Sequence, residues 1–386
     1  MDFELNEEHR MLRDSVASFA AKELQTLAEE MDDNDDWPEG LWRKLGDLGI
    51  NGITVGPEYG GAGADILSAA LACEELARVC PAVALSWGAH ANLCCNNLNV
   101  NGNEEQKKKY LPRLCTGEHV GALGLTEPNA GSDAVSIQTS AKKDGDCYVV
   151  NGTKTFITNG PDADTIILYT KTNKEAGAKG ITAFILDTKF PGFSVSRRLD
   201  KVGNRGSQTG ELFFEDCRIP AENILGQENR GVAVMMSGLD VERAFFSSYA
   251  LGIAEGAFAL ALKYSKERVQ FGRPIAAFQF IQGKLADMYT QIEASRLLCY
   301  KAAIMAGQAE RGGKGTEVHK IASSAILFAA EMADRVCEQA VQIHGGYGYC
   351  REYPVQRFWR DAKLGTIGAG TSEVRRLVIA GELIKG

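Results

Sequence analysis

The chain has 386 residues, which is too long for one simple core, so we expect two or three domains. Hydrophobic residues make up 45% of the chain and charged residues 24%, as in an ordinary globular protein, and no apolar run approaches the roughly 18 residues of a membrane span. The net charge of -8 argues against nucleic acid as a general partner, because phosphate binding needs a basic surface.

The N-terminus, "MDFELNEEHR", is acidic and lacks the basic and apolar regions of a signal peptide. We therefore expect a cytoplasmic protein, or a mitochondrial matrix protein after processing. The ten cysteines are scattered from Cys73 to Cys350 without a C-x-x-C pair, which is typical of reduced, buried thiols. The five histidines are also scattered, and none has a metal-ligand spacing, so we expect no metal site.

Residues 1–118 are expected to form an N-terminal helical domain. "LNEEHRMLRDSVASFAAKEL" has helical periodicity, "DDNDDWP" interrupts it, and "EGLWRKLGDLG" predicts a short helix that ends at Gly49. "GPEYGGAGAD" predicts a glycine-rich loop. The segments "ILSAALACEELARVC" and "NEEQKKKYLPRLCTGE" then return to a helical pattern.

Residues 119–228 are expected to form a central antiparallel β domain. The runs "CYVVNGTKTFITN", "TIILYT", "ITAFILD" and "ELFFEDCRIP" are short and rich in β-branched and aromatic residues. Clusters of Gly, Asn, Asp and Pro separate them, and "NKEAGAKG" predicts a loop tip.

Residues 229–386 are expected to form a C-terminal four-helix bundle. Three long helical patterns begin near Gly231, Phe278 and His319, and the first continues for many turns without a proline. The order is helices, strands, helices, and no alternation of strand and helix suggests a Rossmann sheet. The fold class that we predict is therefore α+β with three domains.

Five motifs occur in order along the chain. They are "LTEPNAGSD" (125–133), "KTFITNG" (154–160), "ERVQFGRPIAAFQ" (267–279), "QIHGGYGY" (342–349) and "RDAKLGTIGAGTSEVRR" (360–376). Together they resemble the acyl-CoA dehydrogenase family over essentially the whole chain. "WGAHANLC", "GLDVER", "LADMYT" and "GAGTSEVRRLVI" are most similar to its isovaleryl-CoA dehydrogenase branch. The resemblance implies FAD, a coenzyme A thioester substrate, a homotetramer, and electron transfer to an electron-transfer flavoprotein.

The implied reaction is α,β-dehydrogenation, which needs a carboxylate base close to Cα of the thioester. Many family members carry this glutamate at the position of Ala369, whereas the isovaleryl branch carries it at the position of Glu242. The helical neighbours of Glu242, among them Leu239, Met235 and Phe246, are apolar, and burial there raises a carboxylate pKa. The alternative is that Glu242 is an ion-pair partner on a solvated face. The resemblance also makes the backbone N–H of Ala369 a donor to the thioester oxygen.

The resemblance implies two sets of FAD contacts. The flavin ring and pyrophosphate are expected against the β domain, where Phe156 replaces a tryptophan found in several relatives, and an ordinary turn is the alternative for Gly131 and Ser132. The adenosine end is expected on a neighbouring subunit, and plain interface packing is the alternative there. The first set is Leu123, Leu125, Thr126, Gly131, Ser132, Phe156, Ile157 and Thr158, and the second is Arg268, Phe271, Gln279, Gln342, Ile343, Gly346, Thr371 and Glu373.

The substrate residues carried over by the resemblance are Leu93, Ser132, Arg243, Phe246, Tyr249, Gly368 and Gly370. Gly368 and Ala369 are small, which leaves room for a branched acyl group. The segment "AFFSSYALG" after Arg243 departs from the isovaleryl pattern and places rings and hydroxyls near the expected pocket. An aryl or carboxylate branch, as in benzylsuccinyl-CoA or methylsuccinyl-CoA, is therefore a further hypothesis. Repacking of the core is the alternative explanation, as a structural ion pair is for Arg243.

Two alternative functions compete with this prediction. A flavin-dependent oxidase or hydroxylase on the same fold would use O₂, and a base aligned with a thioester pocket argues against it. A non-enzymatic relative that binds DNA would need a basic surface, which the acidic charge balance disfavours.

Overall fold

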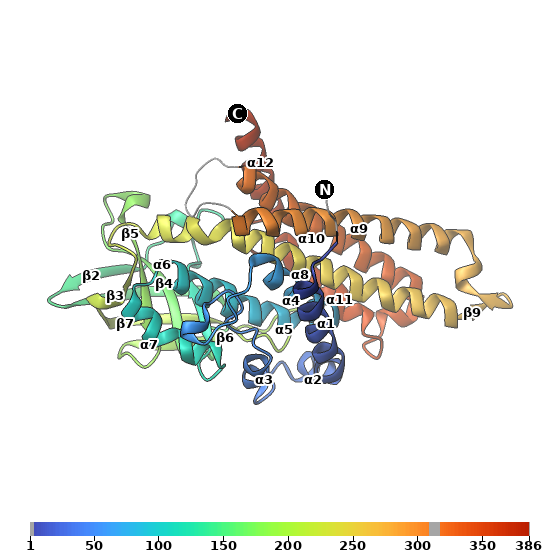
Figure 1. Cartoon of the computed structure of the whole chain (residues 1–386), viewed down its shortest axis with the longest axis horizontal. Coiled ribbons are helices and arrows are strands. Elements are labelled where there is room, and N and C mark those ends of the chain that lie inside the picture. Colours follow the sequence, from blue (N-terminus) through green and yellow to red (C-terminus); the bar gives the residue numbers. More distant parts are fainter. Residues whose placement is uncertain (1–3, 309–316, 386) are drawn as a thin grey trace.

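The computed structural model describes residues 4–308 and 317–385, so the first three residues of the expected N-terminal domain lie outside the described residues. Three parts follow one another along the chain: helices, a β-sheet, and long helices (Figure 1). The order matches the predicted fold class. Whether the three parts fold as separate domains with boundaries after 118 and 228 stays a prediction.

The N-terminal part is a layer of short helices whose ends are fixed by side-chain caps. The side chains of Asn6 and Asp65 accept hydrogen bonds from backbone N–H groups in the first turns, and Asn103 forms a capping box with Gln106. The elements are α1 (Glu7–Phe19), η1 (Ala20–Leu24), α2 (Gln25–Asn34), α3 (Leu41–Asp47), η2 (Pro57–Tyr59), α4 (Ile66–Val79), α5 (Pro81–Gly88), η3 (Ala89–Asn96), α6 (Asn97–Asn101) and α7 (Glu104–Cys115).

The central part is one eight-stranded sheet in the order β6-β7-β3-β2-β4-β5-β8, with β1 paired to β4. Most neighbours are antiparallel, as predicted, but β1 and β2 both pair with β4 in parallel, so the sheet is mixed. Chain connections that return across the sheet, rather than tight hairpins, cause this mixture. The strands are β1 (Gly121–Gly124), β2 (Ser140–Asp144), β3 (Cys147–Thr158), β4 (Thr165–Lys171), β5 (Ile181–Asp187), β6 (Phe193–Arg198), β7 (Thr209–Pro220) and β8 (Ile224–Leu225).

The C-terminal part contains three long helices that pack side by side. A short β-hairpin joins the first two, and α11 packs against both α8 and α10 in place of a fourth long helix. The elements are α8 (Gly231–Glu267), β9 (Val269–Gln270), β10 (Arg273–Pro274), η7 (Ile275–Ala277), α9 (Gln279–Gln308), α10 (Glu317–His344), η8 (Gly345–Tyr349), α11 (Val355–Ala362), η9 (Lys363–Thr366) and α12 (Ser372–Lys385).

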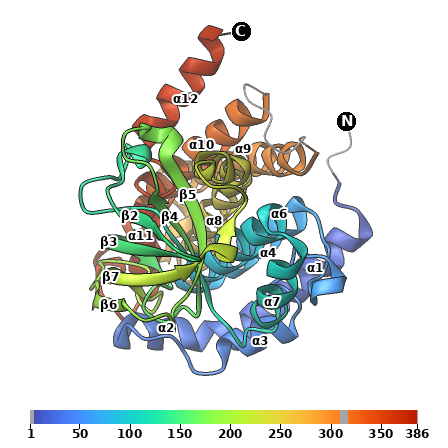
Figure 2. The ribbon, with the colours of Figure 1, turned by 90° about the vertical axis from the view of Figure 1, so that its left-hand side faces the viewer.

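Helix α8 connects all three parts of the molecule. It begins beside β5 of the sheet, packs against α4 of the N-terminal layer, and ends at the β9–β10 hairpin at the far end (Figures 1 and 2). It is long and apolar enough to cross a membrane by composition alone, but most of its apolar window is buried inside the protein, as in the core helix of a globular fold. Its side chains join one large apolar core shared by the N- and C-terminal helices.

Candidate active site

Glu242 is half-buried on α8, within electrostatic reach of Arg375 on α12 and Tyr169 on β4. Burial raises the pKa of its carboxyl group, and the charges of Arg243 and Arg375 oppose that rise. Its negative charge also reaches Tyr169 on β4, where burial raises the pKa of the phenol first and Glu242 adds to the rise. Within the described ranges Glu242 has neither a hydrogen bond nor an ion pair at contact distance. The alternative of an ion-pair partner on a solvated face therefore finds no support.

Arg243 follows Glu242 and is 5% exposed. Its Nη1 lies 3.6 Å from Oδ1 of Asp240 and 3.2 Å from Nδ1 of His319, which itself lies 2.6 Å from the same Asp240 oxygen. The structural ion pair that we considered for Arg243 is thus present. The Nε of Arg243, in the residue next to Glu242, is a buried donor without a hydrogen-bond partner among the described residues.

The loop between η9 and α12 carries Ala369 in a left-handed backbone conformation. Its φ is 53°, and Gly370 follows with a φ of 86°. Alanine pays a steric cost of roughly 1 kcal/mol there, so the loop must be held by its surroundings. Arg375 helps to stabilise the loop, because its guanidinium donates hydrogen bonds to the carbonyls of Gly365 and Gly368 at 2.9 and 2.6 Å. Within the described residues the N–H of Ala369 has no acceptor, so it is free to donate to a ligand.

Thr371 and Glu373 begin α12 directly after this loop. The hydroxyl of Thr371 accepts from the N–H of Val374 at 3.3 Å, which caps the helix. Hydrogen bonds at the helix start lower the pKa of Glu373, whose side chain is exposed. Arg375 was not among the residues that the sequence singled out, although it stands within the motif "GAGTSEVRR".

A buried ion pair fixes the β-domain side of the site. Nζ of Lys154 donates to Oε1 of Glu127 at 2.7 Å and to the carbonyl of Leu125 at 2.9 Å. Burial lowers the pKa of Lys154 to about 8, although Glu127 opposes that shift. The N–H of Thr155 donates to the carbonyl of Thr126 at 2.9 Å. The sequence analysis did not identify this ion pair, although Glu127 and Lys154 both lie in the motifs quoted above. A lysine among the β-branched residues of a predicted buried strand could have indicated it.

Phe156 projects from a β-bulge in β3. The register against β7 slips between Lys154 and Ile157, and Phe156 takes a φ of 58°. The bulge turns its ring outward, 68% exposed, while Ile157 is buried in the core of the sheet. An outward aromatic ring beside the backbone edge at Leu125 and Thr126 fits a flavin ring, because the ring can stack and the edge can hydrogen-bond.

The remaining residues predicted around the flavin ring and thioester lie on nearby elements. Leu123 is half-buried on β1 and pairs with Ile167. Gly131 and Ser132 are exposed in the turn after the Glu127–Ala130 bridge. Thr158 pairs with Thr209 at the end of β3, and Leu93 is half-buried in η3, which packs against β1 and α8.

Tyr249 does not line this site. Its side chain is 0% exposed, and its hydroxyl donates to Oδ1 of Asn204 at 2.6 Å within the large helical core. Phe246 stacks on it with ring centroids 4.8 Å apart. Phe245 is buried too, and the hydroxyl of Ser247 donates to a backbone carbonyl of its own helix. Tyr249, Phe245 and Ser247 therefore fill the core, because this stretch of α8 packs against α4 and α5, whereas a role for the half-buried Phe246 in the substrate pocket stays a prediction.

Part of the set predicted for the adenosine end of FAD lies around the β9–β10 hairpin. Arg268 stacks over Tyr347 at 5.5 Å, which joins the end of α8 to η8. Phe271 forms the hairpin turn with a φ of 51° and is 93% exposed. Figure 1 places this hairpin far from the sheet. Arg268, Phe271 and Gln279 lie between α8 and the start of α9, whereas Gln342, Ile343 and Gly346 lie at the end of α10 and in η8. The other two residues of this set, Thr371 and Glu373, lie at the start of α12 beside the Ala369 loop.

A cleft of about 530 Å³ lies elsewhere, lined by α1, α4, α8 and α9. It contains none of the predicted catalytic residues. Charged side chains line it, and Arg296 there contacts Glu74, Glu255 and Glu293. This cluster joins helices of the N- and C-terminal parts. The described residues contain no group of three or more His, Cys, Asp or Glu side chains arranged to hold a metal ion.

Comparison with known proteins agrees with this arrangement. Three family models match in succession: the acyl-CoA dehydrogenase N-terminal domain over residues 6–118, the middle domain over 122–217, and the C-terminal domain over 229–384. The chain belongs to the acyl-CoA dehydrogenase family. Members of this family are flavin-dependent oxidoreductases, so the enzyme class predicted from the motifs is confirmed.

Individual acyl-CoA dehydrogenases match along almost their whole length. A mitochondrial isovaleryl-CoA dehydrogenase of Solanum tuberosum is 50% identical over 97% of this chain and 90% of its own length. The structure of butyryl-CoA dehydrogenase from Megasphaera elsdenii superposes with a TM-score of 0.95, at 45% identity and full coverage of both chains. A chain from a structural study of the electron transferring flavoprotein of Acidaminococcus fermentans has a TM-score of 0.96 at 46% identity, also over the full length of both.

Proposed function

We propose that this enzyme uses FAD to dehydrogenate a short, branched acyl-CoA thioester to the enoyl-CoA, with Glu242 as the base. The observation that carries the proposal is that two groups lack hydrogen-bond partners within the described residues. One is a half-buried carboxylate without a partner, and the other is the unpaired N–H of Ala369 on a strained loop. These are the acceptor and the donor that removal of an α-proton from a thioester needs.

The residues of this chain divide the reaction between them. Glu242 takes the proton from Cα, and the N–H of Ala369 stabilises the charge that develops on the thioester oxygen. FAD, when bound, supplies the acceptor for the hydride that leaves Cβ. Loss of the proton and the hydride leaves a double bond between Cα and Cβ. Phe156 and the edge at Leu125 and Thr126 would hold the flavin ring on the β-domain side.

A branched acyl group is favoured by Gly368. Its backbone does not have a positive φ, and an added Cβ would lie at an ordinary 3.5 Å from its closest neighbour, the carbonyl oxygen of Leu364. Neither the backbone nor the packing therefore requires glycine, and its smallness leaves space toward the site. The isovaleryl-CoA relative has a branched substrate in its name. Because Tyr249 and its neighbours fill the core, an aryl or second carboxylate branch, as in benzylsuccinyl-CoA or methylsuccinyl-CoA, has less support.

We further propose a homotetramer that donates its electrons to an electron-transfer flavoprotein. Most residues of the second FAD set lie around the β9–β10 hairpin and η8, and Figure 1 shows that hairpin far from the sheet that carries the first set, so the complete site needs a second copy. The exposed rings of Phe271 and Phe280, at 93% and 90% exposure, suit a surface that another chain covers. The similarity to a chain studied with an electron transferring flavoprotein supports the acceptor.

The test is flavin bleaching under anaerobic conditions. The purified, FAD-loaded protein is mixed with butyryl-, isovaleryl-, methylsuccinyl- and benzylsuccinyl-CoA, and the flavin absorbance is followed. We expect isovaleryl-CoA to bleach the wild type and not the Glu242→Gln variant. Glu215→Gln, a change at an exposed position on β7, is the matched control and should bleach normally. Equal bleaching by Glu242→Gln would disprove the base assignment, and no bleaching of the wild type by any thioester would disprove the reaction.

The oxidase alternative is tested in the same samples. After bleaching, air is admitted and the return of flavin absorbance is timed. A dehydrogenase reoxidises slowly in air and quickly with an electron-transfer flavoprotein. Reoxidation by O₂ at the rate of turnover would instead establish the oxidase.

A further inference from the structure

Arg375 is buried in a way that needs a physical reason. Its side chain is 0% exposed and is among the largest fully buried side chains of the protein, although the next two residues of α12, Arg376 and Leu377, are exposed. A guanidinium removed from water is costly unless its donors and its charge are compensated. The contacts of Arg375 show what compensates it, and they lie on two sides.

On one side, Arg375 forms hydrogen bonds with the loop that carries Ala369. Its Nη1 donates to the carbonyl of Gly365 at 2.9 Å, and its Nη2 donates to the carbonyl of Gly368 at 2.6 Å. These two carbonyls stand on the N-terminal side of the strained residues. The rigid fork of a guanidinium fixes both at once, which an ammonium group cannot do. The direction of the Ala369 N–H therefore depends on Arg375.

On the other side, Arg375 acts on Glu242. Burial raises the pKa of Glu242, and Arg243 and Arg375 are the two positive charges that oppose the rise. Burial and then Arg243 lower the pKa of Arg375 to about 10, and Glu242 is foremost among the negative charges that counteract this. The Nε of Arg375 has no hydrogen-bond partner in the described part of the chain, so this guanidinium keeps an unused buried donor.

The other charged and titratable groups around this pair come from every element packed against it. They are Asp240 on α8, His319 and Glu331 on α10, Glu373 on α12 and Tyr169 on β4. Asp240 and His319 contact each other and Arg243, and Glu331 forms an ion pair with Arg376. These groups have interaction partners of their own, whereas Glu242 has no contact partner among the described residues. Arg243 and Arg375 are therefore the charges that favour its ionised form.

We propose that Arg375 is a positioning residue that serves both halves of the reaction. It aims the Ala369 N–H at the thioester oxygen and keeps Glu242 in the ionised form that accepts the α-proton. The inference rests on the proposed function, and it goes further by naming a residue that neither takes a proton nor contacts the reacting atoms. It also explains why the base on α8 and the oxyanion donor on the loop before α12 act together.

Two substitutions separate the two roles. Arg375→Lys keeps the charge and loses the fork, so the maximal rate of flavin bleaching should fall on the order of 100-fold while its acidic pH limb stays in place. Arg375→Gln loses the charge, so the rate should fall and the acidic limb should move to higher pH. Substrate KM should change little in either variant. Arg376→Lys and Arg376→Gln, one residue along on the surface, are the matched controls and should behave as wild type.

A second readout does not depend on turnover. The infrared band of a protonated carboxyl group is followed against pH, and Glu242 is assigned by subtracting the spectrum of Glu242→Gln. In Arg375→Gln the carboxyl of Glu242 should remain protonated to a higher pH than in the wild type, and in Arg375→Lys it should not. If Arg375→Gln fails to fold, Arg375→Lys alone decides, because a wild-type rate in that variant overturns the inference.

The failure of this inference can be told from the failure of the proposed function. If the wild type bleaches and Glu242→Gln does not, the function stands. If Arg375→Gln then shows the wild-type rate, pH limb and infrared titration, only the role of Arg375 is overturned. If no thioester bleaches the wild type, the function fails and this inference fails with it.

Discussion

At the scale of single residues, opposing electrostatic effects tune Glu242. Removal from water favours the neutral acid, and the guanidinium groups of Arg243 and Arg375 favour the anion. The net pKa is raised, so the ionised group is a stronger base than an exposed glutamate. This balance is what general-base catalysis on a weak carbon acid requires.

The pH dependence of bleaching follows from that balance. Ionised Glu242 is the active form, so the rate should fall as the pH drops through its raised pKa. The midpoint of the acidic limb should therefore lie above about 4.3, the usual pKa of glutamate. Stopped-flow bleaching rates at saturating isovaleryl-CoA, measured across the acidic range, give the midpoint. A limb at or below the usual glutamate value would contradict the burial of the base.

Phe156 offers a test of the flavin position. Because its ring is 68% exposed, Phe156→Ala removes little buried area, and the thermal stability of the FAD-free protein should hardly change. If the ring stacks on the flavin, the Kd for FAD should rise by roughly tenfold, which is about 1.4 kcal/mol. Phe213→Ala, at an exposed position on β7 of the same sheet, is the control. Equal FAD affinities in both variants would remove Phe156 from the site.

At the scale of secondary-structure elements, α8 and α4 approach each other closely. Gly252 of α8 lies against the backbone of α4, where an added Cβ would come within 2.2 Å of the carbonyl oxygen of Glu74. Most of α4 from Leu67 to Ala77 is buried, so it cannot move aside easily. The close approach of the two helices explains why glycine stands in the middle of a helix, where it is otherwise unfavourable.

The same substitution should therefore have opposite effects at two helical glycines. Gly252→Ala should destabilise the protein by roughly 1–3 kcal/mol or more, because the added methyl overpacks the contact between α8 and α4. Gly283→Ala on α9, where a Cβ meets nothing within 4 Å, should be neutral or stabilise by up to about 1 kcal/mol. Urea denaturation of both FAD-loaded variants measures the difference. Similar values at the two sites would mean that α8 and α4 are further apart than described.

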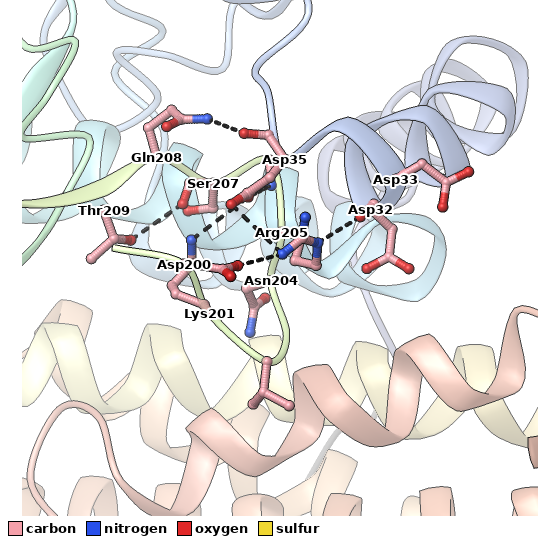
Figure 3. A network of polar contacts seen from close by, with 12 residues as sticks. Asp32, Asp33, Asp35, Asp200, Lys201, Asn204, Arg205, Ser207, Gln208 and Thr209 are labelled. Carbon is pink, nitrogen blue, oxygen red and sulfur yellow. Dashed lines mark hydrogen bonds and ion pairs between the residues drawn. The ribbon is translucent and has the colours of Figure 1, made fainter. Parts of the chain in front are cut away.

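At the scale of the whole molecule, a polar network ties the three parts together around residues 200–209 (Figure 3). Asp35, at the end of α2, accepts from the N–H of Gly206 at 2.7 Å, and Arg205 donates to the carbonyl of Asp32 at 2.6 Å. On the other side, the N–H of Asn204 donates to Asp361 of α11 at 2.5 Å.

The network reaches the flavin side of the site through the neighbouring residues of the same loop. The N–H of Asn159 donates to the carbonyl of Gln208 at 2.7 Å, and its side chain donates to the carbonyls of Ser86 and Gly121 at 2.8 and 3.1 Å. Asn159 stands at the end of the segment that carries Phe156. The network thus links the position of that segment to the N- and C-terminal helices.

Asp361 makes this network dependent on pH. Burial raises its pKa to about 6, so the folded protein binds a proton there that the unfolded chain, at a usual aspartate pKa of about 3.9, has released. Its contribution to stability is present at low pH and is lost as the pH rises through about 6. Asp361→Asn, which keeps an acceptor for Asn204, should gain roughly 2 kcal/mol relative to wild type between pH 4.5 and 7.5.

The measurement for Asp361 is urea unfolding of both FAD-loaded proteins at the two pH values. Asp33→Asn, at an exposed position near the same network, is the control and should show no comparable change. A difference between Asp361→Asn and wild type that does not depend on pH would show that Asp361 is ionised throughout the range.

The sequence by itself determined the order of the three parts and the reaction class. Helical and strand periodicities are local, so each segment predicts its own structure, and the glycine-rich motifs carry the family resemblance wherever the chain folds them. The sequence alone also shows that Ala369 stands where many relatives have a glutamate, and it predicts an apolar helix face around Glu242.

Only the tertiary structure decided which side chains share a site. Three features depend on contacts that a local pattern does not encode. They are the parallel pairing of β1 and β2 with β4, the burial of Tyr249, and the hydrogen bond from Arg375 to Gly365. A periodic pattern tells that one face of α8 is buried, but not whether that face meets a substrate or another helix. That choice is made by packing, because the partner of a face lies elsewhere in the chain.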